Sequence, residues 1–334
     1  MNPRKTSVSH AAFLEAGPLV PRFAGICMQS LTHPVAARHP SPEGAQSPGH
    51  SEMNPLWRGV PARAGCVRRH LFTIAAFLFL PLFLHAAEPV EVLVQGAERL
   101  EVGEIVAALE QPQKLMIGPF SFWTGRIGGH RIAVQLTGQA LLNCTTSTIL
   151  GIEEFSPKLI INQGTSGAQA PYLTVHDIII GQRALDYSGF VTPVRAVGQG
   201  SAPLSWTPVP QRLRDLAMGK LVTYPDGFAG DPAALAIALR TRNSMGRVFA
   251  GVIGSANEVN LELDRVRWSH QVFGMDVEEM ESGVVAAVAH AYGIRYIAFR
   301  VVSDAPYEGV QFIPQAARAT GLFTVRFLEN LPPL

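Results

Sequence analysis

The sequence predicts an α/β protein, a three-layer α/β/α sandwich with a mixed, twisted central sheet formed by residues 88–334. Two observations lead to this fold. Apolar runs of strand length alternate with longer segments of helical pattern along this part of the chain. The chain is 47% hydrophobic and only 16% charged, which is enough apolar material for one sizeable core.

The stretch from Phe273 to Asp304 carries the clearest pattern. Ser282 to Tyr292 is rich in Ala and suits a buried helix, and Tyr296 to Val302 is apolar apart from Arg300, as in a buried strand. Asp304 follows at the carboxyl end of this strand, where α/β proteins bind ligands. Three carboxylates stand at the helix entrance, where the helix dipole favours anions: Glu278, Glu279 and Glu281. The alternative is a solvated helix start and an ordinary turn acid.

Residues 1–87 differ in composition from the rest. Residues 1–70 are rich in Pro, Ser, His and Arg without a hydrophobic period, which indicates disorder. Arg68 and Arg69 precede the apolar run Leu71 to Leu84, and small residues follow, as in a secretory signal peptide. Because signal peptides begin a chain, we expect a natural start at Met53, a signal peptide over residues 53–87, and residues 1–52 as a disordered or mis-assigned extension. We therefore expect an exported protein, periplasmic or secreted; the alternatives are a retained membrane anchor and a buried core helix.

The expected mature chain opens with a strand and a helix. Pro89 to Val94 alternates in hydrophobicity, and Ala97 to Leu109 has a helical period that places Leu100 on the inner side. A strand that feeds a helix through a glycine turn puts Glu101 in the first helical turn, at the carboxyl edge of the sheet. Cys144 is left without a disulfide partner once the signal peptide is removed.

Turn residues divide the next part of the chain. Residues 120–127 and 131–136 form a predicted hairpin across a Gly-Gly pair. Residues 158–161 form a short buried strand, and residues 162–168 read as a Gly-rich turn that offers N–H groups to a ligand or is a plain tight turn. Residues 182–230 contain several Pro and Gly and indicate a long surface excursion, as a lid or an interface arm.

Five short motifs follow one another along residues 90–330. They are G-A-x-x-x-E at Gly96 to Glu101, a degraded T-G-x-G-x-x-N at Thr137 to Asn143, an N-T-G-S-A-G-like turn at Asn162 to Gly167, E-M-E at Glu279 to Glu281, and R-x-x-S-D at Arg300 to Asp304. Together they resemble the purine nucleoside phosphorylase and nucleosidase superfamily, and within it the 5′-methylthioadenosine/S-adenosylhomocysteine nucleosidases. The resemblance implies a nucleoside phosphorylase-like sandwich that cleaves the N-glycosidic bond of a purine nucleoside into free base and a ribose derivative.

The resemblance also implies a role for each matching residue. Asp304 protonates the departing purine at N7, which neutralises the leaving group, and Glu101 activates the attacking water. Glu281 accepts hydrogen bonds from the ribose hydroxyls and offsets the positive charge of the sugar in the transition state. The other implied binding positions are Met280 against the sugar, Glu279 at the ribose and water end, Thr165 as a small hydroxyl residue near the acid, and the backbone around Val259 at the purine edge.

Glu258 departs from the nucleosidase pattern, which has an aromatic residue at this position. A carboxylate cannot stack on a purine, but it can accept the N1–H of a 6-oxopurine. The alternative is that Glu258 points into solvent and backbone atoms alone contact the base. The sequence therefore leaves the choice between adenine and a 6-oxopurine open.

Hydrolysis is favoured over phosphorolysis. The phosphorylases hold phosphate with cations, including an Arg just before the Gly-rich turn, whereas this turn contains Asn162 and Gln163. Glu98 and Glu101 in the first helical turn would repel phosphate, while a carboxylate suits a water nucleophile. The alternatives are a phosphate-dependent purine nucleoside phosphorylase and a non-catalytic nucleoside-binding or storage protein of the same fold.

Composition bounds the partners. The formal net charge is +1 and there is no basic stripe, so no nucleic-acid partner is expected. His176 and His290 stand alone, so the sequence predicts no metal site, and no cofactor is expected. The expected partners are a small-molecule nucleoside and a second copy of the chain in a homodimer, with no membrane contact after signal cleavage.

Overall fold

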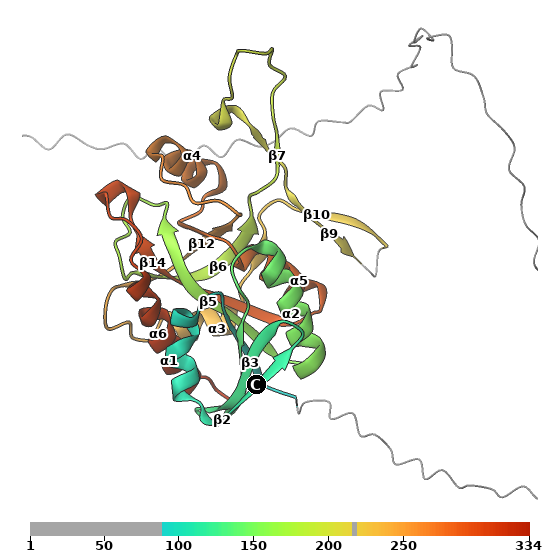
Figure 1. The fold of residues 1–334 in the computed structure, drawn as a ribbon, viewed down its shortest axis with the longest axis vertical. Helices are drawn as coiled ribbons and strands as arrows, with labels where there is room; N and C mark the ends of the chain where they lie inside the picture. Colours follow the sequence, from blue (N-terminus) through green and yellow to red (C-terminus); the bar gives the residue numbers. More distant parts are fainter. Residues whose placement is uncertain (1–88, 216–218) are drawn as a thin grey trace, which may run out of the picture. The chain divides into compact units, whose positions relative to one another are not determined.

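The computed structural model describes residues 89–215 and 219–334. The predicted signal peptide and the segment before it lie outside these residues. In the described part of the chain, a mixed sheet is covered by helices on both faces, so the predicted α/β/α sandwich is confirmed (Figure 1).

The central sheet has ten strands. Their bounds are β1 Val92–Gly96, β2 Glu110–Ile117, β3 Phe120–Ile127, β4 His130–Leu136, β5 Leu159–Ala168, β6 Ile178–Asp186, β11 Phe228–Ala229, β12 Val248–Ser255, β13 Val277–Glu279 and β14 Arg295–Asp304. The order is β11–β6–β12–β13–β5–β1–β4–β3–β2, and β14 pairs with both β5 and β6. β1 is parallel to β4 and β5, whereas β2, β3 and β4 are antiparallel neighbours, so the sheet is mixed as predicted.

Part of the sheet closes on itself. β5 pairs with β14 and β13, β6 pairs with β14 and β12, and β12 pairs with β13. The register places Asp304 of β14 and Glu278 of β13 opposite the same residue of β5, Gly167. The pairing of β12 with β13 in turn places Ser255 beside Glu279. This closure brings the ends of strands that are far apart in the sequence to one place.

Six α-helices occur in the described residues, and five of them form the outer layers. Their bounds are α1 Arg99–Ala108, α2 Leu141–Phe155, α3 Pro232–Ala238, α4 Leu263–Phe273, α5 Ser282–Ala291 and α6 Ala317–Glu329. Alternate strand residues enter two separate cores: Leu93 packs in the core with α2 and α5, while its neighbours Val92 and Val94 pack in the core with α1, α3 and α6. Side chains of a strand alternate between faces, so this division follows from the strand period.

Two sequence-based expectations for the first half of the sheet need correction. Leu100 is 50% exposed instead of buried, and Val102 takes the inner position of α1. Residues 162–168 are not a turn, because β5 continues through them to Ala168. Hydrogen bonding to β14 and β13 outweighs the weak strand preference of Gly and Ser here. The predicted hairpin is confirmed as β3 and β4.

The surface excursion predicted for residues 182–230 is shorter than expected, because residues 182–186 belong to β6 and residues 228–229 to β11 of the main sheet. Residues 190–215 and 219–224 leave this sheet. They form two small antiparallel pairs, β7 (Phe190–Val191) with β8 (Thr207–Pro208) and β9 (Gln211–Asp215) with β10 (Lys220–Tyr224), and they project from the sandwich (Figure 1). We call this segment the arm.

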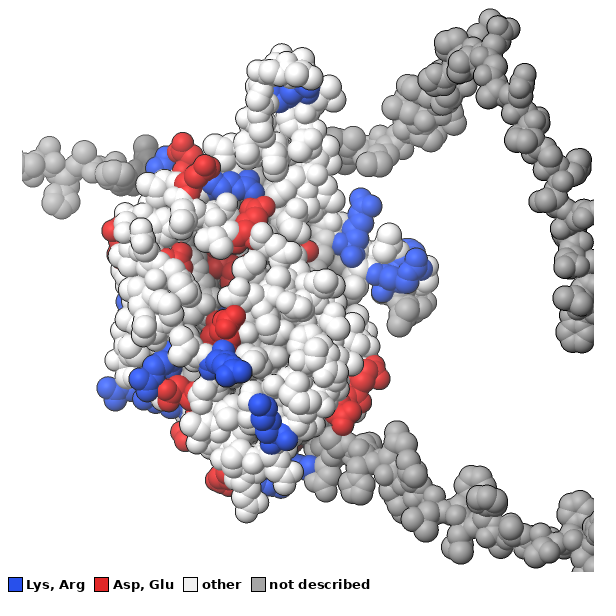
Figure 2. Space-filling model, viewed as in Figure 1, with Lys and Arg blue, Asp and Glu red and all other residues white. Residues whose placement is uncertain are grey.

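None of the helices in the described residues is long and apolar enough to cross a membrane. On the face drawn in Figure 2, Lys and Arg are scattered among Asp and Glu.

Candidate active site

A cavity of about 770 Å³ opens where the ends of β5, β13 and β14 meet. We call it the main cavity. Its lining includes all the residues to which the sequence assigned a role: Glu101, Thr165, Glu258, Val259, Glu279, Met280, Glu281 and Asp304. These residues come from five separate parts of the chain, and the fold brings them together at the strand ends, where α/β proteins bind ligands.

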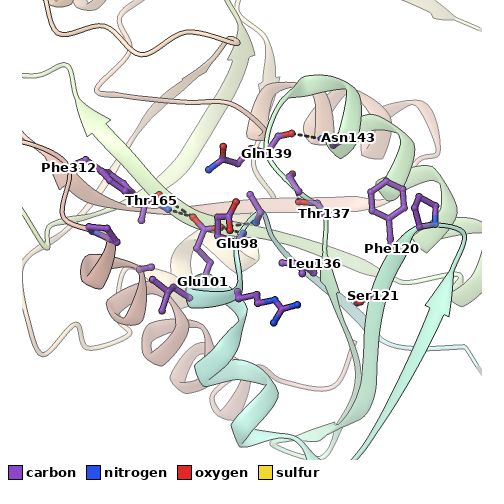
Figure 3. Close-up of a pocket in the computed structure, with 17 residues that line it drawn as sticks. Glu98, Glu101, Phe120, Ser121, Leu136, Thr137, Gln139, Asn143, Thr165 and Phe312 are labelled. Carbon is purple, nitrogen blue, oxygen red and sulfur yellow. Dashed lines mark hydrogen bonds between the residues drawn. The ribbon is translucent and has the colours of Figure 1, made fainter.

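Glu101 is held by hydrogen bonds at both carboxylate oxygens. The backbone N–H groups of Ala97 and Glu98 donate to Oε2 at 2.7 and 2.9 Å. Thr165 donates to Oε1 through its N–H at 2.8 Å and its hydroxyl at 3.1 Å (Figure 3). A β-carbon at Gly164 would lie 2.5 Å from Oε1 of Glu101, so only glycine lets this side chain approach β5. The carboxylate therefore has a fixed position at the start of α1.

Arg300 is a buried cation at the centre of the site. Its guanidinium forms ion pairs with Glu279 at 2.5 Å and Glu281 at 3.3 Å, and it also donates hydrogen bonds to Asn162 and Ser282. Burial by itself would lower the pKa of Arg300, but the neighbouring carboxylates outweigh this effect and raise it. One guanidinium therefore compensates two buried carboxylates.

The two carboxylates paired with Arg300 are not equivalent. Glu279 accepts hydrogen bonds from the N–H groups of Glu281 and Ser282 at 2.9 to 3.0 Å and from the hydroxyl of Ser255, so it caps the start of α5. Glu281 is held more loosely, because its donors, including the N–H of Ala140, all lie at 3.3 Å. Burial raises the pKa of Glu281, which Arg300 opposes. Glu281 is thus the carboxylate with capacity left for a ligand hydroxyl.

Asp304 lies at the other end of the main cavity. Its Oδ1 accepts a hydrogen bond from Ser303 at 2.9 Å, and no described residue donates to Oδ2. A β-carbon at Gly167 would lie 2.7 Å from Oδ2, so the glycine leaves the carboxyl room. Burial raises the pKa of Asp304, and the Ser303 hydrogen bond only partly opposes this. A carboxyl with a raised pKa keeps its proton to higher pH, as a general acid requires.

Glu258, for which the sequence left two interpretations open, lines the main cavity. Its carboxylate pairs with Arg265 at 3.3 Å and is about one third exposed. Arg265 in turn stacks over the rings of Phe190 and Trp268. Glu258 is therefore held at the outer wall. Val259 also lines this cavity, and its side chain is exposed.

A second cavity of about 650 Å³ adjoins the first. The two share Ala97, Glu101, Gln139, Thr165 and Phe312, and the second continues past Glu98 and Asn143 to the start of β3 (Figure 3). The residues shared by the two cavities include Glu101 but not Asp304, so the second cavity adjoins the Glu101 end of the main cavity. A ligand bound between Asp304 and Glu281 can therefore extend into this second space.

Three residues in or beside the cavities received no role from the sequence: Arg300, Glu278 and Phe312. Arg300 had a visible signal, because a charged residue inside an apolar strand requires a buried partner. Glu278 lines the main cavity beside Asp304, but one of three adjacent carboxylates cannot be singled out by spacing. Phe312 lines both cavities from the loop before α6, where no periodicity marks it.

In residues 89–215 and 219–334, no group of three or more His, Cys, Asp or Glu is placed to hold a metal ion.

The fold and the cavity define an α/β protein that places several carboxylates around one cavity at the strand ends. The chain belongs to the phosphorylase superfamily, whose family model matches residues 92–329.

Individual relatives agree with this assignment. The 5′-methylthioadenosine/S-adenosylhomocysteine nucleosidase of Shewanella halifaxensis is 26% identical over 244 residues, which cover 71% of this chain and 97% of the relative. That of Bacillus cereus strain G9842 is 26% identical over 249 residues, which cover 72% and 99%. The crystal structure of the Neisseria meningitidis nucleosidase with methylthio-immucillin-A has a TM-score of 0.58 at 24% identity, covering 72% of this chain and 99% of that one. This last likeness is one of fold.

The cluster around Arg300 gives a prediction about stability. In Arg300→Met, Glu279 and Glu281 lose their buried counter-charge, so the free energy of unfolding should fall by about 3–5 kcal/mol at neutral pH, measured by urea denaturation. Arg318→Met is the matched control, because its pair with Glu104 is largely exposed and should contribute about 1 kcal/mol or less. Equal losses in the two variants would contradict the assignment of Arg300 as the centre of the site.

Proposed function

We propose that this chain is a nucleosidase that hydrolyses the N-glycosidic bond of a purine nucleoside of the 5′-methylthioadenosine/S-adenosylhomocysteine type, releasing the free base and a ribose derivative. The observation that carries this proposal is the convergence of Glu101, Glu281 and Asp304 in one cavity. Their placement matches the needs of the reaction, with an acid at one end and two carboxylates at the other. The relatives named above support the same activity.

Cleavage builds positive charge on the sugar and negative charge on the base. Glu281 binds the ribose hydroxyls. Its negative charge offsets the positive charge on the sugar, and this attraction becomes stronger as that charge grows in the transition state. Asp304 donates its proton to N7 as the bond breaks. The 5′ substituent extends past Thr165 into the second cavity, which adjoins the ribose end.

Glu101 takes the proton of the attacking water. Each of its two carboxylate oxygens already accepts two hydrogen bonds, so a water must replace one of the four donors. Three of these donors are backbone N–H groups, which are fixed in direction, whereas the Thr165 hydroxyl can rotate its hydrogen away. Thr165 therefore opens a lone pair of Glu101 to the nucleophile.

Water, not phosphate, is the nucleophile in this proposal. Among the described residues that line the main cavity there is no Lys or Arg, and Glu101 occupies the place where a nucleophile approaches the sugar. The buried cation nearby, Arg300, is already paired with Glu279 and Glu281. Within the main cavity, a phosphate dianion would meet carboxylates and no Lys or Arg of the described residues.

The nucleophile assignment predicts that free base is released without phosphate and that Glu101→Gln loses this activity by about 10²–10⁴-fold, because an amide cannot take a proton. The variant should stay folded, although the amide cannot satisfy every donor and should cost about 1–3 kcal/mol of stability. Chromatography of the released base and circular dichroism measure the two effects.

Glu104→Gln, one turn later on α1, is the matched control and should keep full activity. Strict dependence on phosphate, with ribose 1-phosphate as the product, would convert the assignment to a phosphorylase.

The acid assignment predicts that Asp304→Asn lowers kcat by about 10²–10⁴-fold, or about 3–5 kcal/mol of transition-state stabilisation, with little change in KM. The amide still donates a hydrogen bond to N7 but transfers no proton. Since Asp304 must be protonated to act and its pKa is raised, kcat/KM in the wild type should fall as pH rises through that pKa, and the variant should lack this limb.

A p-nitrophenyl riboside separates the acid from a structural residue, because its leaving group needs no proton. Asp304→Asn should affect this substrate far less than a purine nucleoside, and the exposed Asp264→Asn should affect neither. Equal losses on both substrates would show that Asp304 is not the acid.

Export remains a proposal that rests on the sequence before residue 88. Two findings support it. The family match begins at residue 92, and 71–72% of this chain is enough to cover 97–99% of the two relatives. The segment with Arg68 and the apolar run to Leu84 is therefore additional to the common domain. Mass spectrometry of the protein from its native host should find an N-terminus near Ala87 or Glu88. An intact Met1 would refute export.

We also propose a homodimer that uses the arm as part of its interface. The arm exposes apolar side chains at Val191, Val194, Val197, Leu204 and Leu221. Exposed apolar side chains gathered on one segment are typical of a protein contact. Light scattering should give twice the mass of one chain, and a Val194→Glu, Val197→Glu double variant should give a monomer. A wild-type monomer at all concentrations would contradict the proposal.

A further inference from the structure

Glu278 is a second carboxyl at the end of the main cavity that holds Asp304. It lines the cavity although its side chain is almost fully buried. Both residues lie opposite Gly167 in the sheet, Asp304 on β14 and Glu278 on β13, on the two sides of β5. Residues that are register partners on neighbouring strands project from the same face of a sheet. The Asp304 carboxyl occupies the space that the missing side chain of Gly167 leaves, and Glu278 lies across β5 from it.

Three hydrogen bonds hold Glu278 in this position. Asn260 donates its backbone N–H to Oε1 and its side-chain amide to Oε2, both at 2.6 Å, and the Tyr187 hydroxyl donates to Oε2 at 2.9 Å. Oε2 thus has two donors and Oε1 has one. A carboxylate oxygen has two lone pairs, so Oε1 can accept one more hydrogen bond from a ligand.

The purine edge that carries N7 also carries the substituent at position six. Adenine presents the N7 acceptor beside an N6 amino donor, whereas a 6-oxopurine presents N7 beside the O6 acceptor. In the function proposed above, on which this step rests, Asp304 contacts N7. The neighbouring carboxyl on the same face, Glu278, then faces the group at position six.

We propose that Glu278 is a specificity-determining residue that reads the group at position six of the base. As a carboxylate, it accepts a hydrogen bond from a 6-amino group and repels a 6-oxo group. As a protonated carboxyl, it can donate to a 6-oxo group. Its charge therefore sets the preference between the two classes of purine, a choice that the sequence assigned only to Glu258.

Glu258 is less suited to this role than Glu278. Arg265 neutralises the Glu258 carboxylate at the outer wall, and a third of that side chain is exposed. A base contact there competes with water and with the guanidinium. No ion pair joins Glu278 to a cation among the described residues. Its neighbours are Tyr187, Asn260 and Asp304, while Glu258 and Arg265 act on Tyr187.

The titration of Glu278 makes this inference measurable near neutral pH. Burial raises the pKa of Glu278 to about 7, with the charge of Asp304 adding to the shift, while the Asn260 and Tyr187 hydrogen bonds oppose it. Glu278 is therefore mostly protonated below this pH and ionised above it. The preference for a 6-aminopurine over a 6-oxopurine should rise as pH increases. Asp304 contacts N7, which both bases share, so its direct effect on binding cancels in the ratio.

Calorimetric binding of adenine and hypoxanthine at about pH 6 and about pH 8 tests the inference without any turnover. In the wild type, the ratio of the Kd of hypoxanthine to that of adenine should rise by about fivefold to tenfold between the two conditions, following the ionised fraction of Glu278. In Glu278→Gln the ratio should not change with pH, because the amide does not titrate. The exposed Glu262→Gln is the matched control and should keep the wild-type slope.

Tyr187→Phe is a second variant for the case that Glu278→Gln fails to fold. It removes a donor that favours the ionised form, so the midpoint of the selectivity change should move to higher pH. An unchanged slope in Glu278→Gln, an unchanged midpoint in Tyr187→Phe, or failure of both bases to bind overturns the inference. Selective binding of this kind by a protein that cleaves no nucleoside would support the role of Glu278 and contradict the proposed nucleosidase activity.

Discussion

The buried guanidinium of Arg300 is the interaction on which the site depends. Without it, Glu279 and Glu281 would be two unpaired carboxylates in the interior, at a cost of several kcal/mol. With it, Glu279 can cap α5 and Glu281 can be left under-coordinated and free to bind a ligand. Glycine at position 164 is part of the same arrangement, because a side chain there would collide with both Glu101 and Arg300.

Strands β5, β14, β6, β12 and β13, which close on themselves, give the cavity two chemically different ends. At one end, Glu101 and Glu281 lie close to Arg300 and Thr165, in a setting suited to positive charge on a sugar. At the other end, burial raises the pKa of Asp304 and so favours its protonated form, which the Ser303 hydrogen bond partly opposes. An acid and a base with environments that differ in this way can act in one reaction at one pH. The five strands, not any single motif, fix the separation of these ends.

Much of this could be predicted from the sequence, and the failures have identifiable causes. The helix and strand after Met280 were visible from local periodicity, and the motif order indicated the family. The extension of β5 through residues 162–168 was not, because it depends on pairing with β13 and β14, which are more than 100 residues away. Glu278 and Phe312 were missed for a similar reason, since only the tertiary fold turns them towards the cavity. Leu100 was wrongly placed because the helical period does not reveal a cavity beside α1.

The central claim is that water attacks the sugar while Glu101 and Asp304 serve the two ends of the bond. The most direct measurement is a single turnover in ¹⁸O-labelled water, followed by mass spectrometry of the ribose product. The account predicts one ¹⁸O atom at the anomeric position of the ribose and an unlabelled free base, with or without phosphate in the buffer. An unlabelled sugar phosphate as the product, or no cleavage of any purine nucleoside, would contradict it.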